Sequence, residues 1–260
     1  MASPSTARSE RRNPAAFVAG QFLFLARLLL MASSLIATLL LHNIWRLFRR
    51  PSPWPRLFLG GVARIAGARV TVDGAPWGKG AFLLGNHVSW LDIPVIAGAT
   101  GTAFVAHSGL AEHGLLKWLC AMNDTVFVAR HDRRSVHTQV EHVRAALNDT
   151  GALTVFPEGT TSDGTGLLPF KSSLLSALDP PPVGIALQPV WLDYGADVAQ
   201  MAWVGEELGL DNFLKILARR RPQPVTVHFL PPLNADETAN RKTMAIAARN
   251  RILAAIACKQ

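Results

Sequence analysis

Residues 15–45 limit the folding of this 260-residue chain more than any other stretch, because they are almost entirely apolar. Arg27 is the only Lys, Arg, Asp or Glu among them. A helix of roughly 20 apolar residues can cross the hydrocarbon core of a bilayer, and this run is longer. A cleaved signal peptide fits less well, because the apolar core is too long and no small-residue cleavage site precedes a soluble-looking start. The sequence therefore predicts an N-terminal apolar helical membrane anchor.

The charges around this segment leave its membrane topology open. Arginines flank both ends, so the preference for positive charge on the cytoplasmic side gives no clean orientation. Arg27 would be costly at the centre of a bilayer. A true span and an interfacial or re-entrant anchor fit equally well. Pro51, Pro53 and Pro55 then break the segment, and residues 56–66 are amphipathic. They predict either a membrane-surface helix or an ordinary helix packed on the domain.

Three regions follow from these patterns. Residues 1–13 are polar and basic, and we expect a disordered basic tail. Residues 14–66 are predicted to be the membrane anchor with its interfacial helices. Residues 67–260 have the apolar content and length of one folded domain.

Strands and helices alternate throughout the third region. The predicted strands are residues 69–74, 81–86, 102–106, 125–130, 152–156, 183–192 and 225–230. The predicted helices are residues 110–121, 135–151, 172–178, 208–219 and 237–257. This alternation predicts an α/β fold, in which one domain has a central mixed, mostly buried sheet flanked by helices.

Polar side chains follow the strand predicted at residues 81–86. His87 and Asp92 lie five positions apart, where this strand gives way to the next element. A rigid strand holds such residues while the turn exposes them. The pair suits a charge relay in which His accepts a proton and Asp fixes its tautomer. Taken alone, the pair favours a structural role, and the Asp fits equally well as a helix cap.

A second strand end carries another polar group. The strand predicted at residues 152–156 runs into a turn that supplies Glu158, Gly159 and Thr160. Glycine lets a ligand approach the backbone, and hydroxyls bind polar head-group oxygens. Arg130 also ends a predicted strand and has the chemistry to hold a phosphate. The structural alternatives are a well-capped turn and a solvated charge.

Several classes of protein are disfavoured by what the sequence lacks. It has no Gly-x-Ser-x-Gly nucleophile elbow and neither of the glycine-rich nucleotide-binding loops. Its histidines lack a recognised metal spacing, so no metal is predicted. The net charge of +8 attracts nucleic acid or anionic lipid. Because the basic residues are spread out and the chain has an apolar anchor, we expect no nucleic-acid partner.

Four blocks of the sequence resemble, in the same order, those of the glycerolipid acyltransferases, the lysophosphatidic acid acyltransferase group. They are Asn-His-x-x-x-x-Asp at 86–92, an apolar block ending in Arg at 126–130, Phe-Pro-Glu-Gly-Thr at 156–160 and an apolar-Pro block at 187–190. One His-x-x-x-x-Asp alone would not be specific, whereas four ordered blocks are.

The resemblance implies a membrane-bound O-acyltransferase. His87 would act as general base on the hydroxyl of a lysolipid, and Asp92 would orient His87. The hydroxyl would attack the thioester of acyl-CoA or an acyl-carrier protein directly, without a cofactor, a metal or an acyl-enzyme. Glu158, Gly159 and Thr160 would position the acceptor head group.

The resemblance has two departures and leaves the acceptor open. Arg130 would contribute charge at the acceptor. In the first departure, Thr161 replaces the Arg that commonly follows Gly-Thr in the family. In the second, Asp124 stands where the second block usually has a Gly. The Gly-Thr-Thr-Ser-Asp-Gly form is similar to the lyso-ornithine lipid acyltransferase branch. Lysophosphatidic acid (1-acylglycerol-3-phosphate) and lyso-ornithine lipid therefore fit equally well.

The expected partners are the bilayer, the lysolipid acceptor and the acyl donor. We expect the protein at the membrane, on the cytoplasmic face of the inner (plasma) membrane. The alternative is a non-catalytic, membrane-attached lipid-binding or lipid-transfer protein on the same fold.

Overall fold

The computed structural model describes residues 14–48, 52–78, 80–107, 125–128, 141, 145–147 and 151–259. The predictions for the tail at residues 1–13, for the helix at residues 110–121 and for Arg130 fall outside these residues. So does most of the helix predicted at residues 135–151.

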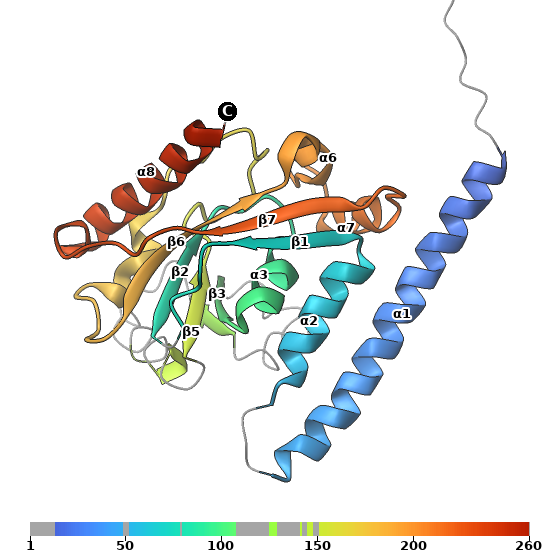
Figure 1. The fold of residues 1–260 in the computed structure, drawn as a ribbon, viewed down its shortest axis with the longest axis horizontal. Coiled ribbons are helices and arrows are strands. Elements are labelled where there is room, and N and C mark those ends of the chain that lie inside the picture. The colour runs from blue at the N-terminus through green and yellow to red at the C-terminus, as the bar shows by residue number, and fades with distance from the viewer. Residues whose placement is uncertain are drawn as a thin grey trace, which may run out of the picture.

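A mixed seven-stranded sheet forms the centre of the described structure (Figure 1). The strands are β1 (Ala68–Asp73), β2 (Ala81–Gly85), β3 (Ala103–His107), β4 (Val126–Val128), β5 (Ala152–Val155), β6 (Ala186–Asp193) and β7 (Gln223–Phe229). Their spatial order is β1-β7-β6-β2-β5-β3-β4. β6 and β7 run antiparallel, and the other neighbouring pairs run parallel. The predicted α/β fold with a mixed sheet is therefore confirmed.

Both faces of the central strands are buried, as the continuous apolar runs predicted. Successive side chains of a strand point to opposite faces. In β2, Ala81 and Leu83 join one core cluster, while Phe82 and Leu84 join another on the opposite face. The edge strand β1 is the exception, because every residue in it after Ala68 is exposed.

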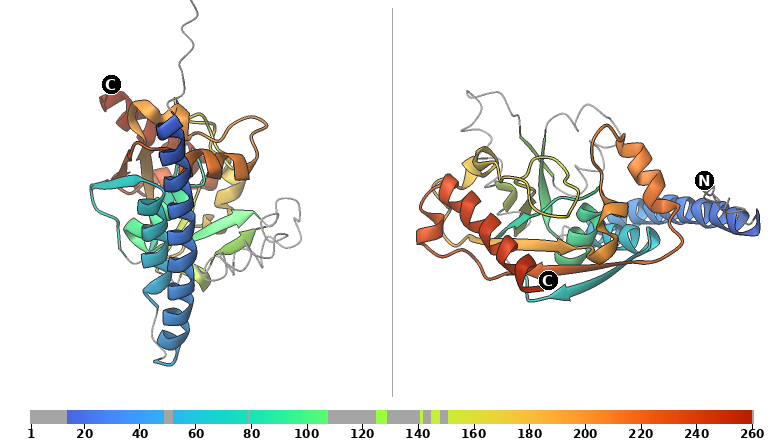
Figure 2. Two further views of the ribbon diagram at one scale, coloured as in Figure 1. Left: turned by 90° about the vertical axis from the view of Figure 1, so that its right-hand side faces the viewer. Right: turned by 90° about the horizontal axis from the view of Figure 1, so that it is seen from above.

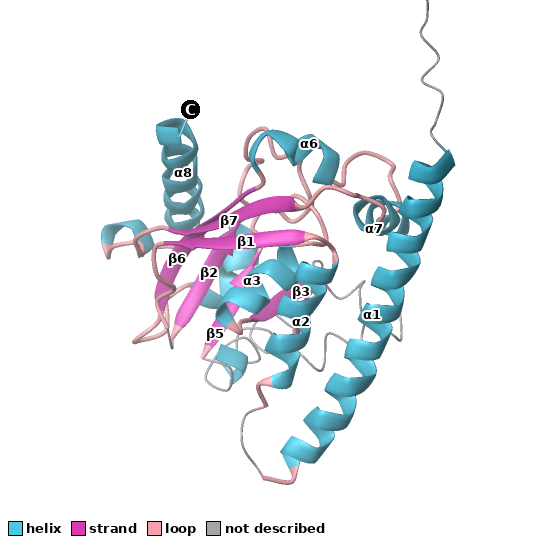
Figure 3. Ribbon diagram, turned by 45° about the vertical axis from the view of Figure 1, so that its right-hand side comes forward, coloured by secondary structure: helices cyan, strands magenta, loops and turns pink. Residues whose placement is uncertain are grey.

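Helices cover the two faces. On the first face lie α2 (Trp54–Ile65) and α3 (Asp92–Thr100), which meet at Gly60 and Gly98. A Cβ atom added at Gly98 would lie 2.6 Å from the Gly60 Cα, so this helix contact requires glycine. On the second face lie the 3₁₀-helix η2 (Ser172–Leu178) and α8 (Arg241–Lys259). Figure 3 shows the helices beside the sheet.

Shorter elements lie in the segments that follow β6 and β7. They are η3 (Gly195–Asp197), α6 (Val198–Met201), α7 (Gly209–Leu217) and η4 (Asp236–Thr238). The helix predicted from residue 237 begins later, at Arg241. The Asn240 side chain accepts hydrogen bonds from the backbone N–H groups of Lys242 and Thr243, which caps α8 at that point.

The first helix, α1 (Pro14–Arg46), lies beside α2 (Figures 1 and 2). Among the described residues it is the one helix long and apolar enough to cross a membrane. Phe24, Leu28 and Met31 pack against the core of the domain. Its other side exposes large apolar residues, namely Phe22, Leu25, Leu29, Leu30, Ile36, Leu40, Leu41 and Ile44. α1 is therefore a candidate membrane anchor that also contacts the domain.

Arg27 is paired with the domain. It is 8% exposed, and its Nη1 donates to the carbonyl oxygens of Leu217 at 2.7 Å and Arg219 at 2.6 Å. The last carbonyls of a helix lack partners within the helix, and cations are favoured there. Arg27 thus binds the C-terminal end of α7, which explains a charge inside an apolar run.

Candidate active site

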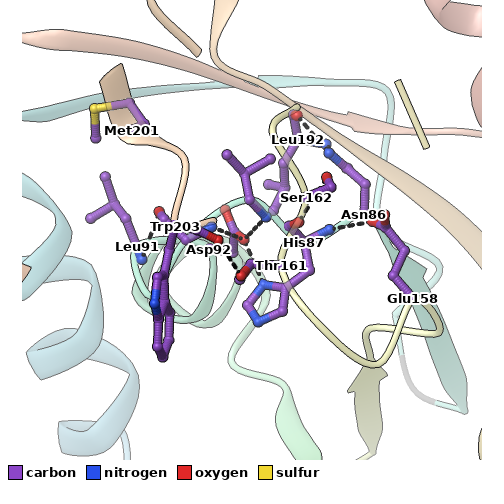
Figure 4. Close-up of polar contacts among 12 residues, drawn as sticks. Asn86, His87, Leu91, Asp92, Glu158, Thr161, Ser162, Leu192, Met201 and Trp203 are labelled. Carbon is purple, nitrogen blue, oxygen red and sulfur yellow. Dashed lines mark hydrogen bonds and ion pairs between the residues drawn. The ribbon is translucent and has the colours of Figure 1, made fainter. Parts of the chain in front are cut away.

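His87 and Asp92 form a hydrogen-bonded pair between β2 and α3. His87 Nδ1 lies 2.7 Å from Asp92 Oδ2 (Figure 4). Asp92 is fully buried, whereas the His87 side chain is 18% exposed. Because Nδ1 faces the carboxylate, Nε2 is the nitrogen that can exchange a proton with a substrate. The pair predicted from the sequence is brought together.

The turn between the two residues is folded around the carboxylate. Asp92 Oδ2 also accepts hydrogen bonds from the backbone N–H groups of Val88 at 2.6 Å and Ser89 at 2.9 Å. These N–H groups precede Asp92, so the residue does not cap the helix that follows it. The five-residue spacing has a physical reason, because it lets the chain return to present one oxygen to three donors.

Tyr194 supplies a fourth donor, which the sequence reasoning missed. Its hydroxyl lies 2.5 Å from Asp92 Oδ1. Tyr194 follows β6, which is the strand next to β2 in the sheet. Burial, and then the Asp92 charge, raise the pKa of the phenol well above its usual value. The phenol therefore keeps its proton as a donor.

The ring of Phe156 lies against His87. The two rings stack with centroids 4.1 Å apart and planes 10° from parallel. Phe156 follows β5, which pairs in parallel with β2. Because carboxyl ends of adjacent parallel strands lie at one edge of a sheet, the residues after β2 and β5 meet. Phe156 thus limits the orientation of the imidazole ring.

Glu158 connects the turn after β5 to the turn after β2. Its Oε1 accepts the backbone N–H of His87 at 2.8 Å, and its Oε2 accepts the N–H of Leu168 at 2.9 Å. The residue is 1% exposed, and this burial raises the pKa of its carboxyl group. Glu158 lies at the site as predicted, but both of its oxygens bind backbone. A contact with the acceptor stays a prediction.

The other residues predicted to bind the acceptor lie in the turn beside Glu158. Gly159 has a φ of +69°, which favours glycine, and a Cβ atom there would lie 3.1 Å from Lys171 Nζ. Thr160 is exposed. Lys171 is therefore a cation next to this turn that the sequence reasoning did not single out. Arg130 lies outside the described residues.

The loop after Thr160 is fastened to the His87 turn. Ser162 donates to the His87 carbonyl oxygen through its backbone N–H at 2.8 Å and through its hydroxyl at 3.1 Å. Thr161 donates its hydroxyl to the Trp203 carbonyl at 2.5 Å, and the Trp203 N–H donates to Val88 O at 2.9 Å. The side chain that replaces the usual arginine therefore binds the protein backbone.

Asn86 attaches the end of β2 to β6. Its Oδ1 accepts the Leu192 N–H at 2.7 Å, and its Nδ2 donates to the Leu192 carbonyl at 3.1 Å. This pair of bonds extends the β2–β6 pairing, which ends at Gly85 and Val190. Asn86 thus fixes the distance between the His87 turn and the residues that follow β6.

These contacts give the candidate site the chemistry of a proton acceptor. A histidine with a fixed tautomer is held by a buried carboxylate at the edge of an α/β sheet, beside a glycine turn and a lysine. Such a unit has the geometry to take a proton from a hydroxyl group or water. Among the described residues no group of His, Cys, Asp and Glu has the geometry to hold a metal ion.

Comparisons with known proteins identify the family. The Acyltransferase family model matches residues 68–193. Lyso-ornithine lipid O-acyltransferase from Rhodobacter capsulatus is 32% identical over 84% of each chain, and that from Brucella abortus is 31% identical over 90% of this chain and 92% of its own. The 1-acyl-sn-glycerol-3-phosphate acyltransferase of Neisseria gonorrhoeae is 30% identical over 63% of this chain and 64% of its own.

The fold has a solved counterpart. The crystal structure of the 1-acyl-sn-glycerophosphate acyltransferase from Thermotoga maritima matches with a TM-score of 0.65 and 17% identity, over 93% of this chain and 96% of that one. The chain belongs to the acyltransferase family, and it is an enzyme of lipid biosynthesis. The resemblance stated from the four sequence blocks is thereby confirmed.

The variant Glu158→Gln distinguishes two roles for Glu158, namely holding the His87 turn in position and binding the acceptor. A glutamine amide presents an N–H donor where the carboxylate accepted one, so one of the two backbone N–H groups loses its acceptor. We expect a loss of about 1–3 kcal/mol in the free energy of unfolding. Because His87 shifts, kcat should fall roughly 10-fold, since small misplacements are costly in catalysis. Thermal unfolding and steady-state kinetics check both effects.

The exposed Glu206→Gln is the matched control, because it removes the same charge from the surface. A variant at Glu158 with unchanged stability and kcat but a raised KM for the acceptor would instead indicate direct acceptor contact.

Proposed function

We propose that the protein is a membrane-bound O-acyltransferase that transfers a fatty acyl group from an acyl thioester to the free hydroxyl of a lysolipid. The observation that carries this proposal is the 2.7 Å pair of His87 Nδ1 and buried Asp92 Oδ2, which leaves Nε2 for the acceptor hydroxyl. The proposed reaction is also supported by the relatives' names, which describe acyltransferases that act on lysolipids.

The residues suggest a one-step transfer with His87 as general base. Nε2 takes the proton of the acceptor hydroxyl while the hydroxyl oxygen attacks the thioester carbonyl carbon and forms the new ester bond. The carbon–sulfur bond breaks, and the imidazolium gives its proton to the departing thiolate, which leaves as a thiol and returns His87 to its neutral form. Asp92 offsets the charge on the imidazolium during the transfer. The donor would be acyl-CoA or an acyl-carrier protein, because both are acyl thioesters.

We propose lyso-ornithine lipid as the acceptor in preference to lysophosphatidic acid. The lyso-ornithine lipid acyltransferases from Rhodobacter capsulatus and Brucella abortus align over most of this chain, whereas the Neisseria enzyme aligns over 63% of it. Thr161 offers no positive charge to a phosphate, and its hydroxyl binds Trp203. Gly159 and Thr160 would contact the head group, with Arg130 adding charge.

The membrane part of the proposal rests on α1 and α2. Residues 14–66 would form the anchor and residues 67–260 the acyltransferase domain. Arg27 and the buried Ala63 attach the anchor to that domain, so its exposed apolar side can face lipid while the site stays at a fixed position. Because acyl-CoA and acyl-carrier protein are cytoplasmic, the site would face the cytoplasmic side of the inner membrane.

The test is an acyl-transfer assay with purified protein in detergent. Lyso-ornithine lipid and 1-acylglycerol-3-phosphate of equal chain length are each offered with acyl-CoA and with acyl-carrier protein. We expect kcat/KM to be at least roughly 10-fold higher for lyso-ornithine lipid, the equivalent of one favourable polar contact. A preference for 1-acylglycerol-3-phosphate would contradict the acceptor. Binding of lysolipid without product would instead support the lipid-binding alternative.

A further inference from the structure

Tyr194 contacts the catalytic pair from a part of the chain that the proposed mechanism does not use. It is the only tyrosine in the sequence, and its side chain is fully buried. Its hydroxyl donates to Asp92 Oδ1, while Oδ2 accepts from His87, Val88 and Ser89. With Tyr194 included, both carboxylate oxygens have donors, as burial of a charged group requires.

We propose that Tyr194 is a positioning residue, whose phenol sets the orientation and the charge distribution of the Asp92 carboxylate that His87 depends on. This proposal rests on His87 being the general base. A carboxylate can rotate about its Cβ–Cγ bond, and the phenol bond to Oδ1 resists that rotation, so Oδ2 stays in line with Nδ1. The same bond draws negative charge towards Oδ1 and away from the imidazole.

The backbone of Tyr194 is itself held in place. The buried Gln223 side chain at the start of β7 donates to the Tyr194 carbonyl at 2.8 Å. Two residues before Tyr194, the backbone N–H and carbonyl of Leu192 each form a hydrogen bond with the Asn86 side chain. Hydrogen bonds from Asn86, which follows β2, and from Gln223 in β7 therefore fix the end of β6 that carries the phenol. This is the arrangement expected of a support for a reacting group.

The phenol is also suited to act as a permanent donor. Its pKa is raised well above the usual value by burial and by Asp92, while a hydrogen bond with Ser89 has the opposite effect. The proton therefore stays on the phenol at any pH where the enzyme works. Tyr194 has no direct contact with His87 among the hydrogen bonds of the described residues, so it acts through Asp92.

Tyr194→Phe removes the hydroxyl and keeps the ring. We expect kcat to fall roughly 10- to 100-fold, the range for a hydrogen bond to a charged group, with little change in the KM of either substrate. The remaining carboxylate keeps more charge beside the imidazolium and so stabilises it. The acid limb of the pH profile of kcat/KM should therefore move to higher pH, and a purely structural role would leave it in place.

The single tyrosine allows a second measurement without deleting the hydroxyl. Growth on 3-fluorotyrosine or 3,5-difluorotyrosine replaces this one side chain with progressively more acidic phenols. A more acidic phenol is a stronger donor and draws more charge from Asp92. The acid limb should then move stepwise to lower pH, opposite to the phenylalanine variant. This series tests the proposal even if Tyr194→Phe does not fold.

Two controls separate the outcomes. Thr154→Val removes another buried hydroxyl, which donates to Thr102 and has no contact with Asp92, and should leave the pH profile unchanged. If His87→Ala is inactive but Tyr194→Phe and both fluorotyrosine enzymes keep the wild-type kcat and acid limb, the Tyr194 proposal is overturned and the base assignment stands. If His87→Ala keeps full activity, the base assignment on which the Tyr194 proposal rests is wrong, and if the wild-type enzyme forms no acylated product, the proposed function itself has failed.

Discussion

His87→Ala is expected to lose at least about 100-fold in kcat with every lysolipid that the wild-type enzyme acylates, because general-base catalysis contributes that much or more. The variant removes the one group whose Nε2 can take the hydroxyl proton in the geometry described above. KM values should change little, because the ring is held by Asp92 and Phe156 rather than by substrate. Steady-state kinetics with purified protein in detergent provide the measurement.

The structure contains a matched control for this variant. His228 Nδ1 also lies 2.7 Å from an aspartate, Asp73 Oδ2, and the His228 ring also stacks on an aromatic ring, Trp191, at 4.6 Å. Asp73, unlike Asp92, is largely exposed. His228→Ala should therefore keep the wild-type kcat. Equal losses in the two histidine variants would show that the assay reports general destabilisation, and full activity of His87→Ala would rule out the base assignment.

The sequence was sufficient to predict that the turns after residues 86 and 156 would lie side by side at the candidate site. His87 and Glu158 follow apolar runs that become β2 and β5, and those strands are parallel neighbours. In a parallel sheet the carboxyl ends of adjacent strands lie at the same edge, which is where ligands bind in α/β folds. The prediction required only that both apolar runs be strands of one sheet. Their apolar composition and the turns that follow them indicated that they are strands.

The direction of individual side chains could not be predicted. Glu158 had the type and position of an acceptor-binding residue, yet its oxygens face the N–H groups of His87 and Leu168. A carboxylate in a turn can bind either a ligand or backbone, and the choice depends on where the turn places those N–H groups. That placement is set by the packing of the loop at residues 159–168, which no periodicity describes.

Contacts between distant segments were missed for a related reason. Tyr194 reaches Asp92 because β6 lies beside β2, and Arg27 reaches α7 because α1 lies along the domain. The strand order places β6 between β2 and β7, so chain order does not give it. A lone tyrosine after a strand and a lone arginine in an apolar helix have no sequence pattern that names their partners.

Asp92→Asn is the variant that separates charge from shape at this site. The amide oxygen can take the place of Oδ2 and accept from His87, Val88 and Ser89. The amide nitrogen then takes the place of Oδ1 and donates to the Tyr194 hydroxyl oxygen, so the phenol proton alone loses its acceptor at residue 92. The fold and the tautomer of His87 should therefore persist, while the negative charge beside the imidazolium is lost.

We expect kcat to fall at least about 100-fold, because the imidazolium formed during proton removal loses its counter-charge. The free energy of unfolding should fall by about 1–3 kcal/mol, because only the Tyr194 donor loses its acceptor. Asp92→Ala should lose as much activity and unfold more easily than Asp92→Asn. It leaves buried donors of Val88, Ser89 and Tyr194 without an acceptor, at a cost of about 1–3 kcal/mol each. Asp73→Asn, which alters the exposed partner of His228, should change neither property. Wild-type kcat in Asp92→Asn would mean that the negative charge of the buried carboxylate is not needed for catalysis.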